Sequence, residues 1–270
     1  MKGKRILMIL TTTAALAALA LALTALTLQR PADLPLKGIS VLLAGDSRSS
    51  DDYTFYKEIL ERKSGCKALV MGASGKTAAY NASDLYMNEV LSTPHDFSIW
   101  LVGGNDDGSS GTVGTFDAFS ELAEQGEPVV GETDLSRDYE GTTFIQAVDH
   151  IMRRYRKESG REGKPGPRMI FCTDLPQQRD SAGSPWSLKE NWERKRLAVL
   201  ECCRKNGVNC LDLYRLCGFN MADEPMFTAP TDKVNDRGIY YMDGLHPNRR
   251  GIDLITNFEI GLIKQYIILE

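Results

Sequence analysis

Short apolar runs alternate with longer amphipathic stretches from residue 39 onward. Five runs are short enough to be buried strands, and apolar residues at helical spacing mark the segments between and after them. The predicted strands are Ile39–Leu43, Ala68–Met71, Phe97–Val102, Met169–Cys172 and Val208–Leu211. The predicted helices are Tyr53–Lys63, Ala82–Leu91, Thr143–Lys157, Leu188–Asn206 and Arg250–Tyr266. This alternation predicts right-handed crossovers, and therefore an α/β fold with a parallel five-stranded sheet covered by helices on both faces.

A continuous apolar stretch precedes this pattern. Residues Ile6–Leu28 contain no charge and no proline, and a helix of about 20 such residues crosses a hydrocarbon core of roughly 30 Å. Lys2, Lys4 and Arg5 come directly before it. The positive-inside bias therefore predicts a cytoplasmic N-terminus and an exported remainder of the chain.

The domain organisation follows from this span. We interpret residues 1–28 as an uncleaved signal anchor, and cleavage as a signal peptide near Ala20–Ala22 is the alternative. Residues 29–38 contain two prolines and are interpreted as a tether. Residues 39–270 then form one globular domain outside the cytoplasm, either membrane-bound or secreted.

Composition and charge narrow the classes of partner. Charged residues make up 25% of the 270-residue chain and hydrophobic residues 42%, which is ordinary for a globular protein. The formal net charge of −4 provides no basic field, so we do not expect a nucleic-acid partner. The basic clusters Arg153–Lys157 and Arg194–Arg196 fall in predicted helices and are interpreted as solvated faces.

Six cysteines are present, an even number that permits disulfides in an exported chain. Cys202, Cys203, Cys210 and Cys217 form the cluster where we would look for one. Cys66 and Cys172 adjoin or lie in strand-like runs and favour buried free thiols instead. The cysteine spacing and the three scattered histidines match no zinc signature, and we expect neither a metal nor another cofactor.

Glycines and polar residues follow the predicted strands. The first strand ends at GDS (45–47), the second at GASG (72–75) and the third at GGND (103–106), and DGLHPN (243–248) precedes the last helix. The carboxyl ends of parallel strands meet at one edge of a sheet, where ligands bind. We therefore expect these four blocks to converge.

The converging residues suit acyl transfer through a serine. The hydroxyl of Ser47 needs a base within hydrogen-bonding reach, and His246 can serve with Asp243 orienting its imidazole. The backbone amides of Ser47 and Gly75 and the side-chain amide of Asn105 are candidate donors to the oxyanion. Taken singly, Gly75 could be only a turn glycine, and Asn105 only a brace of its turn.

The four blocks, in this order, resemble the SGNH hydrolase family, also called the GDSL esterases and lipases. The resemblance runs from about Ile39 to the end of the chain. It implies a flavodoxin-like three-layer α/β/α sandwich. It also implies roles for five residues: Ser47 as nucleophile and oxyanion donor, Gly75 and Asn105 as further donors, His246 as base and Asp243 as its orienter.

Some residues near these blocks have two interpretations. Arg48 stands where the family usually has an aliphatic residue, and it either forms a structural ion pair or binds an anionic group of the substrate. Asp46 is interpreted as a brace of the turn. Trp186, in a predicted loop, is a candidate for substrate contact, whereas Trp100 and Trp192 fit a buried strand and a helix face.

The preferred function is an extracytoplasmic serine esterase that removes short acyl groups, O-acetyl above all, from carbohydrate. Two long segments, 107–141 and 218–242, exceed the usual loop length and are interpreted as functional loops. An O-acyltransferase with the same catalytic residues is the alternative. A non-catalytic glycan-binding domain is less favoured, and a metal-dependent deacetylase is disfavoured by the few histidines.

Overall fold

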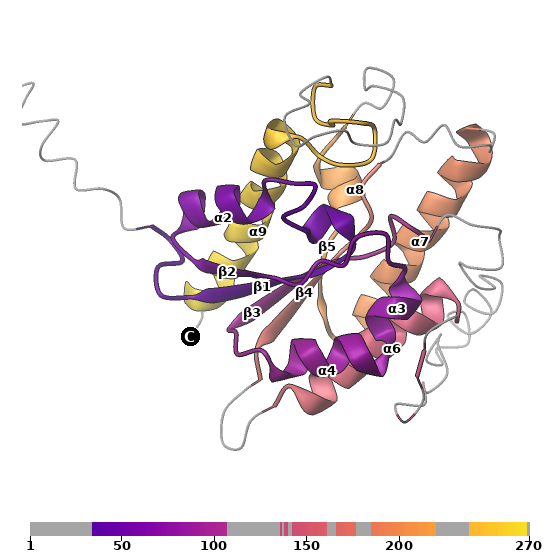
Figure 1. Ribbon diagram of the computed structural model, residues 1–270, viewed down its shortest axis with the longest axis horizontal. Helices are drawn as coiled ribbons and strands as arrows, with labels where there is room; N and C mark the ends of the chain where they lie inside the picture. The colour runs from indigo at the N-terminus through magenta and orange to yellow at the C-terminus, as the bar shows by residue number, and fades with distance from the viewer. Residues whose placement is uncertain are drawn as a thin grey trace, which may run out of the picture. The chain divides into compact units, whose positions relative to one another are not determined.

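A computed structural model describes residues 34–106, 136, 138–139, 142–160, 166–176, 185–219 and 238–268, the side chains of 185–191 excepted (Figure 1). The predicted apolar span and most of both long segments lie outside these residues. Within the described part of the chain, no helix is both long enough and apolar enough to cross a membrane.

Five strands form one parallel sheet, as predicted. They are β1 (Ser40–Gly45), β2 (Lys67–Val70), β3 (Phe97–Leu101), β4 (Arg168–Cys172) and β5 (Asn209–Leu211). Their order across the sheet is β2-β1-β3-β4-β5, and every neighbouring pair is parallel. This is the flavodoxin-like order. All five residues of β3 are buried, which explains why its sequence is apolar on both faces, apart from Ser98, rather than alternating.

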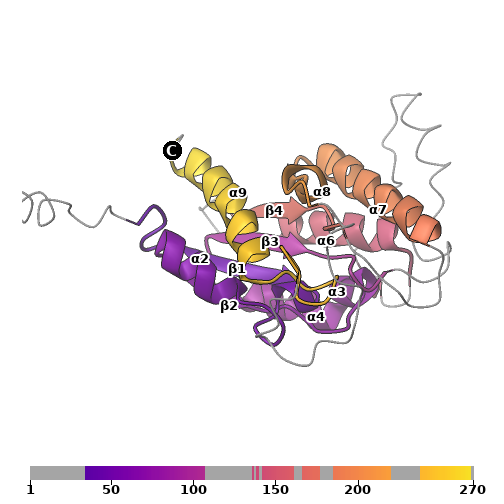
Figure 2. The same ribbon diagram turned by 90° about the horizontal axis from the view of Figure 1, so that it is seen from above.

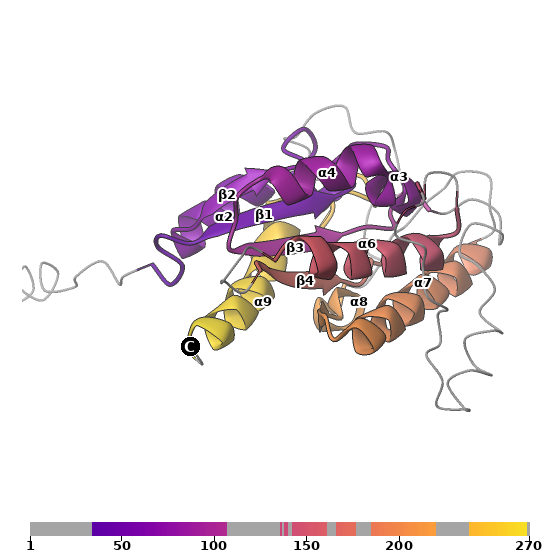
Figure 3. The same cartoon turned by 90° about the horizontal axis from the view of Figure 1, so that it is seen from below.

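Helices cover both faces of the sheet (Figures 1 and 2). One layer holds α2 (Tyr56–Ser64), α8 (Leu213–Leu216) and α9 (Arg249–Ile268). The other layer, nearest the viewer in Figure 3, holds α3 (Ala78–Ala82), α4 (Asp84–Ser92), α6 (Phe144–Glu158) and α7 (Pro185–Asn206). The five predicted helices are confirmed with shifted ends. The sequence pattern missed α3 and α8, because five and four residues are too few to show helical periodicity.

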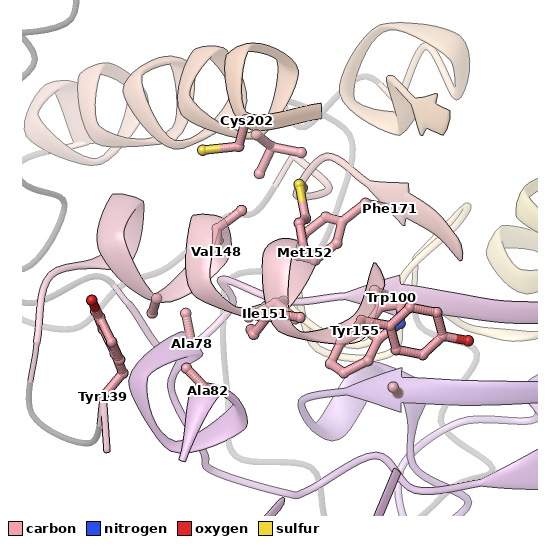
Figure 4. Packing of buried hydrophobic residues seen from close by; sticks show 14 of the residues in the cluster. Ala78, Ala82, Trp100, Tyr139, Val148, Ile151, Met152, Tyr155, Phe171 and Cys202 are labelled. Atoms are coloured by element: carbon pink, nitrogen blue, oxygen red, sulfur yellow. The ribbon is translucent and has the colours of Figure 1, made fainter. Parts of the chain in front are cut away.

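Each face of the sheet has its own hydrophobic core. On the α6 face, Trp100 stacks on Phe171 and meets Tyr155 edge-on (Figure 4). On the α9 face, the buried aliphatic residues of α2 and α9 pack against β1 and β3. Burial of both faces fixes the strand ends that carry the site.

The basic clusters are solvated faces only in part: Arg156 and Lys157 are exposed as predicted, but three other basic residues are buried. Lys195 and Arg196 are 0% and 4% exposed, and Arg154 is 6% exposed. Each is buried beside a carboxylate: Arg196 donates to Asp212, and Arg154 to Asp84. A charge pattern on a helix cannot reveal such partners, because they come from other elements.

All six cysteines are free thiols, so the disulfide considered for the cluster between Cys202 and Cys217 is not formed. Five of the six are buried, and burial raises the pKa of the thiols of Cys66 and Cys172. These cysteines behave as small hydrophobic residues.

One buried acid in the α9-side layer predicts how stability depends on pH. Glu259 is 0% exposed, and the hydroxyl of Tyr56 donates to its Oε1. Burial raises the pKa of Glu259 from 4.5 to about 8. The unfolded chain therefore loses this proton at lower pH than the folded chain does. The resulting stability is complete below pH 4.5 and is lost as pH rises through about 8.

We expect Glu259→Gln to flatten this dependence. Between pH 5 and 8 the free energy of unfolding of the wild type should fall by up to about 1.4 kcal/mol per pH unit from this group alone. Urea denaturation at pH 5, 7 and 9 measures it. Glu58→Gln is the matched control. The hydrogen bond with Arg249 lowers the pKa of this exposed carboxylate, so the contribution of Glu58 to the pH dependence of stability lies below pH 4.5. An equally steep fall in Glu259→Gln would contradict the assignment.

Candidate active site

The turn after β1 presents Ser47 at the carboxyl edge of the sheet. Gly45 has a φ of +130°, and a Cβ there would lie 1.9 Å from the carbonyl oxygen of Leu101, so only glycine fits. The N–H of Asp46 then bonds to that same oxygen at 3.1 Å. A short 3₁₀ helix, η1 (Ser47–Ser49), begins directly afterwards. The strand therefore ends abruptly, with Ser47 as the first helical residue.

Ser47, His246 and Asp243 form one hydrogen-bonded line. Ser47 Oγ lies 2.9 Å from His246 Nε2, and His246 Nδ1 lies 2.7 Å from Asp243 Oδ2. A carboxylate only accepts, so Nδ1 carries the imidazole proton and Nε2 turns its lone pair to the serine hydroxyl. The three residues are at most 5% exposed. The arrangement suits proton transfer from Ser47 to His246.

The loop before α9 fixes the acid and the base. Asp243 Oδ1 accepts the backbone N–H groups of Leu245 at 2.9 Å and His246 at 2.7 Å, which orients the carboxylate. Asn248 Oδ1 accepts the N–H groups of Arg250 and Gly251 and caps the start of α9. The DGLHPN block thus supplies the acid, the base and the cap that anchors them.

Tyr53 is a site residue that sequence reasoning missed. Its ring stacks on the imidazole of His246, with centroids 4.9 Å apart and planes 19° apart. It belongs to the turn that follows η1, six residues after Ser47. Nothing in the local sequence marked it, because the contact depends on two segments meeting in space. The stacked ring limits the orientations open to the imidazole.

The predicted oxyanion donors lie on turns that contact one another. The N–H of Ala73 bonds to Gly45 O at 2.8 Å, which places the turn with Gly75 beside the serine turn. Gly75 has a φ of +72° and open space around its Cα. The side chain of Asn105 donates to Lys76 O at 2.9 Å, so Asn105 links its own turn to the turn that carries Gly75. An amide nitrogen carries two hydrogens, and that bond leaves one for a ligand.

The surroundings of Arg48 and Asp46 match their structural interpretations. The Arg48 side chain is 0% exposed, and its guanidinium donates to Asp46 at 2.6 Å and also to Asp174. Asp46 Oδ2 accepts the N–H of Gly104 at 2.8 Å, so Asp46 braces two turns. No surface of Arg48 is open to an anionic substrate.

The pKa values near this ion pair show how strongly the charges interact. Burial alone would lower the pKa of Arg48, but the charges of Asp174 and Asp46 outweigh it and raise the pKa. Burial likewise opposes ionisation of Asp174, yet Arg48 and Lys195 hold its pKa below the usual value. For Asp106, burial outweighs the opposing charge of Lys195 and raises the pKa to about 6.

The predicted loop position of Trp186 is wrong. Trp186 falls in the first turn of α7 rather than in a loop, since that helix begins at Pro185. The described residues contain no group of three His, Cys, Asp or Glu side chains that could hold a metal ion. Asp174 and Lys195 were not identified from the sequence. Asp174 could have been, because it follows β4 as the other blocks follow their strands.

Known proteins share this architecture. A model of the GDSL-like lipase/acylhydrolase family matches residues 42–254. A possible lipase from Chitinophaga pinensis superposes with a TM-score of 0.57 at 19% identity, over 84% of this chain and 98% of that one. A lipase/acylhydrolase from Enterococcus faecalis gives 0.51 at 14% identity, over 84% and 95%. A catalytic mutant of an acetylxylan esterase from Geobacillus stearothermophilus gives 0.50 at 11% identity, over 84% and 94%. No curated protein matches the sequence.

Proposed function

We propose, because this chain belongs to the GDSL-like lipase/acylhydrolase family, that it hydrolyses esters through a covalent acyl-enzyme on Ser47. Membership makes the chain a carboxylic ester hydrolase, and the residues that perform the reaction are our proposal. The observation that carries it is the line from Ser47 Oγ through the imidazole of His246 to the carboxylate of Asp243.

Acylation is the first step. His246 Nε2 takes the proton of Ser47 as Oγ attacks the ester carbonyl, and Asp243 stabilises the imidazolium that forms. The N–H groups of Ser47 and Gly75 and the second amide hydrogen of Asn105 would face the oxyanion. One such donor typically contributes about 3–4 kcal/mol to lowering the barrier. Collapse of the intermediate breaks the bond to the alcohol, which leaves with the proton from His246.

Deacylation reverses these roles. His246 takes a proton from water, the hydroxide attacks the acyl carbon, and Ser47 leaves with the proton returned by the imidazole. Both steps need a neutral imidazole on His246, because only an unprotonated Nε2 can accept a proton. If a sugar hydroxyl replaces water in this second step, the same residues perform acyl transfer.

We propose a short acyl group on carbohydrate as the substrate. A long acyl chain needs a contiguous apolar surface next to the nucleophile. Large exposed apolar side chains are scattered over separate elements in the described part of the chain: Leu34, Leu85, Leu197, Leu216, Ile239, Ile267 and Ile268. The side chains that hydrogen-bond to Ser47 or His246, or stack on His246, are polar or aromatic. Acetylxylan esterases share the fold, and we extend their acetylated-carbohydrate substrate class to this chain as part of the proposal.

We also propose that the domain works outside the cytoplasm, held by the apolar segment 6–28. The support is the sequence alone: an uncharged stretch long enough to span a bilayer, with Lys2, Lys4 and Arg5 before it. An exported esterase of this kind would meet the polysaccharides of the cell envelope.

A substrate screen tests the proposal. The full-length chain in detergent would be assayed on nitrophenyl esters from acetyl to palmitoyl and on acetylated xylan fragments, with and without an added sugar acceptor. We expect kcat/KM to be highest for acetyl and to fall steadily beyond butyryl. A maximum at long chains would contradict the substrate class. Acylated acceptor as the main product would identify a transferase.

A further inference from the structure

Four charged side chains lie buried together beneath the turn that carries Asn105. They are Asp46, Arg48, Asp174 and Lys195, and none is more than 1% exposed. We call these four residues the charged cluster. They come from the end of β1, from η1, from the segment after β4 and from the middle of α7. Buried charges are costly unless paired, so this cluster calls for an explanation.

The members alternate in sign and contact in sequence. Arg48 Nε and Nη2 donate to the two oxygens of Asp46, at 3.0 and 2.6 Å. Arg48 Nη1 donates to Asp174 Oδ1. Lys195 Nζ lies 3.0 Å from Asp174 Oδ2. The charged cluster is therefore a neutral row of ion pairs, Asp46–Arg48–Asp174–Lys195, that runs from the serine turn to α7.

The two end members of the charged cluster, Asp46 and Lys195, hydrogen-bond to the same peptide group. Asp46 Oδ2 accepts the N–H of Gly104 at 2.8 Å, and Lys195 Nζ donates to the carbonyl oxygen of Gly103 at 2.6 Å. The C=O and N–H of one trans peptide point in opposite directions, so holding both fixes the plane of the peptide. The guanidinium packs against the same unit, since a Cβ at Gly104 would lie 2.8 Å from Arg48 Cζ. The next residue along the chain is Asn105.

We propose that the charged cluster fixes the Gly103–Gly104 peptide and thereby places the Asn105 amide to receive the oxyanion, with Lys195 as a positioning residue. The inference rests on the proposed function, because it assigns a role within the same site. Donors to an oxyanion act only when their geometry is set before the reaction, to within about 0.5 Å. An aliphatic side chain at position 48 could not connect Asp46 to Asp174.

A double-mutant cycle between Lys195 and Asn105 tests this coupling. Lys195→Met keeps the apolar stem and removes the ammonium that holds Gly103 O. We expect kcat on nitrophenyl acetate to fall about 10- to 100-fold, with KM changed less than about threefold. Asn105→Ala should cost about 100-fold or more in the wild-type background. It should cost less than about tenfold in the Lys195→Met background, because the amide is already displaced.

The controls separate positioning from stability. Lys205→Met removes another largely buried lysine of α7, 3.4 Å from Asp149 and ten residues from Lys195. It should leave kcat within about twofold and add independently to Asn105→Ala. If Lys195→Met unfolds at the assay temperature, Lys195→Met with Asp174→Asn removes one charge of each sign and should show the same coupling. Denaturation midpoints of each variant confirm folding.

The outcomes distinguish the two claims. Equal costs of Asn105→Ala in both backgrounds, or an unchanged kcat in Lys195→Met, would overturn the positioning role while leaving the esterase intact. Absence of wild-type hydrolysis, or hydrolysis by Ser47→Ala within 100-fold of the wild-type rate, would overturn the proposed function instead.

Discussion

Replacing Ser47 with alanine is expected to lower kcat for ester hydrolysis by roughly 10⁶-fold, the loss typical when a triad nucleophile is removed. The mechanism has no substitute, because Ser47 Oγ is the hydroxyl that lies 2.9 Å from His246 Nε2. The oxyanion donors would remain, so weak catalysis above the rate in water should persist. Steady-state assays with nitrophenyl acetate at high enzyme concentration measure the residual activity of Ser47→Ala.

A matched control is available in the same turn. Ser49 is buried in η1 two residues away, and Ser49→Ala should keep kcat within about threefold of the wild type, because Ser49 takes no part in the hydrogen-bonded line from Ser47 to Asp243. Both variants should unfold within about 1 kcal/mol of the wild type, because each loses at most one hydroxyl. Ser47→Ala activity within 100-fold of the wild type would exclude Ser47 as the nucleophile.

Asp243→Asn has the second largest expected effect, a fall in kcat of roughly 10⁴-fold. Asp243 uses one oxygen for the N–H groups of Leu245 and His246 and the other for His246 Nδ1. Asparagine has one oxygen only. If that oxygen keeps the two backbone donors, the NH₂ group faces Nδ1 and forces the imidazole proton onto Nε2. His246 then cannot take the proton of Ser47.

The control for this variant is Asp253→Asn, which neutralises a half-exposed carboxylate of α9 that pairs with Lys63. It should leave kcat unchanged within about twofold. Asp243→Asn keeps Ser47, so this variant should still form the acyl-enzyme. Where deacylation limits the rate, its residual kcat should therefore not depend on the leaving group of the ester. A loss smaller than tenfold would mean that Asp243 does not set the tautomer.

The strands were predictable because their physical signal is local. A strand buried on both faces is apolar at nearly every position, as β3 is apart from Ser98, and alternation with helices then implies a parallel sheet. The same logic predicted that the ends of β1, β2 and β3 would meet. The structure indeed places Ser47, His246 and Asp243 in one line. Their catalytic roles stay predictions until the variants are measured.

The rest of the site depended on contacts that no local pattern encodes. Lys195 belongs to a basic stretch that looks like a solvated helix face, and only the approach of α7 to Asp174 and Gly103 makes it buried. Tyr53 stacks on a ring that lies far away along the chain. The roles of such residues follow from contacts between distant elements, and these contacts become visible only in the folded structure.

The most direct measurement is to locate the covalent bond itself. The full-length chain would be treated with a fluorophosphonate, digested and mapped by mass spectrometry, with His246→Ala as a parallel sample. We expect one adduct, on Ser47, formed far more slowly when His246 is absent. Ester hydrolysis by a chain that carries no adduct on Ser47, or carries it on another residue, would show that Ser47 is not the nucleophile.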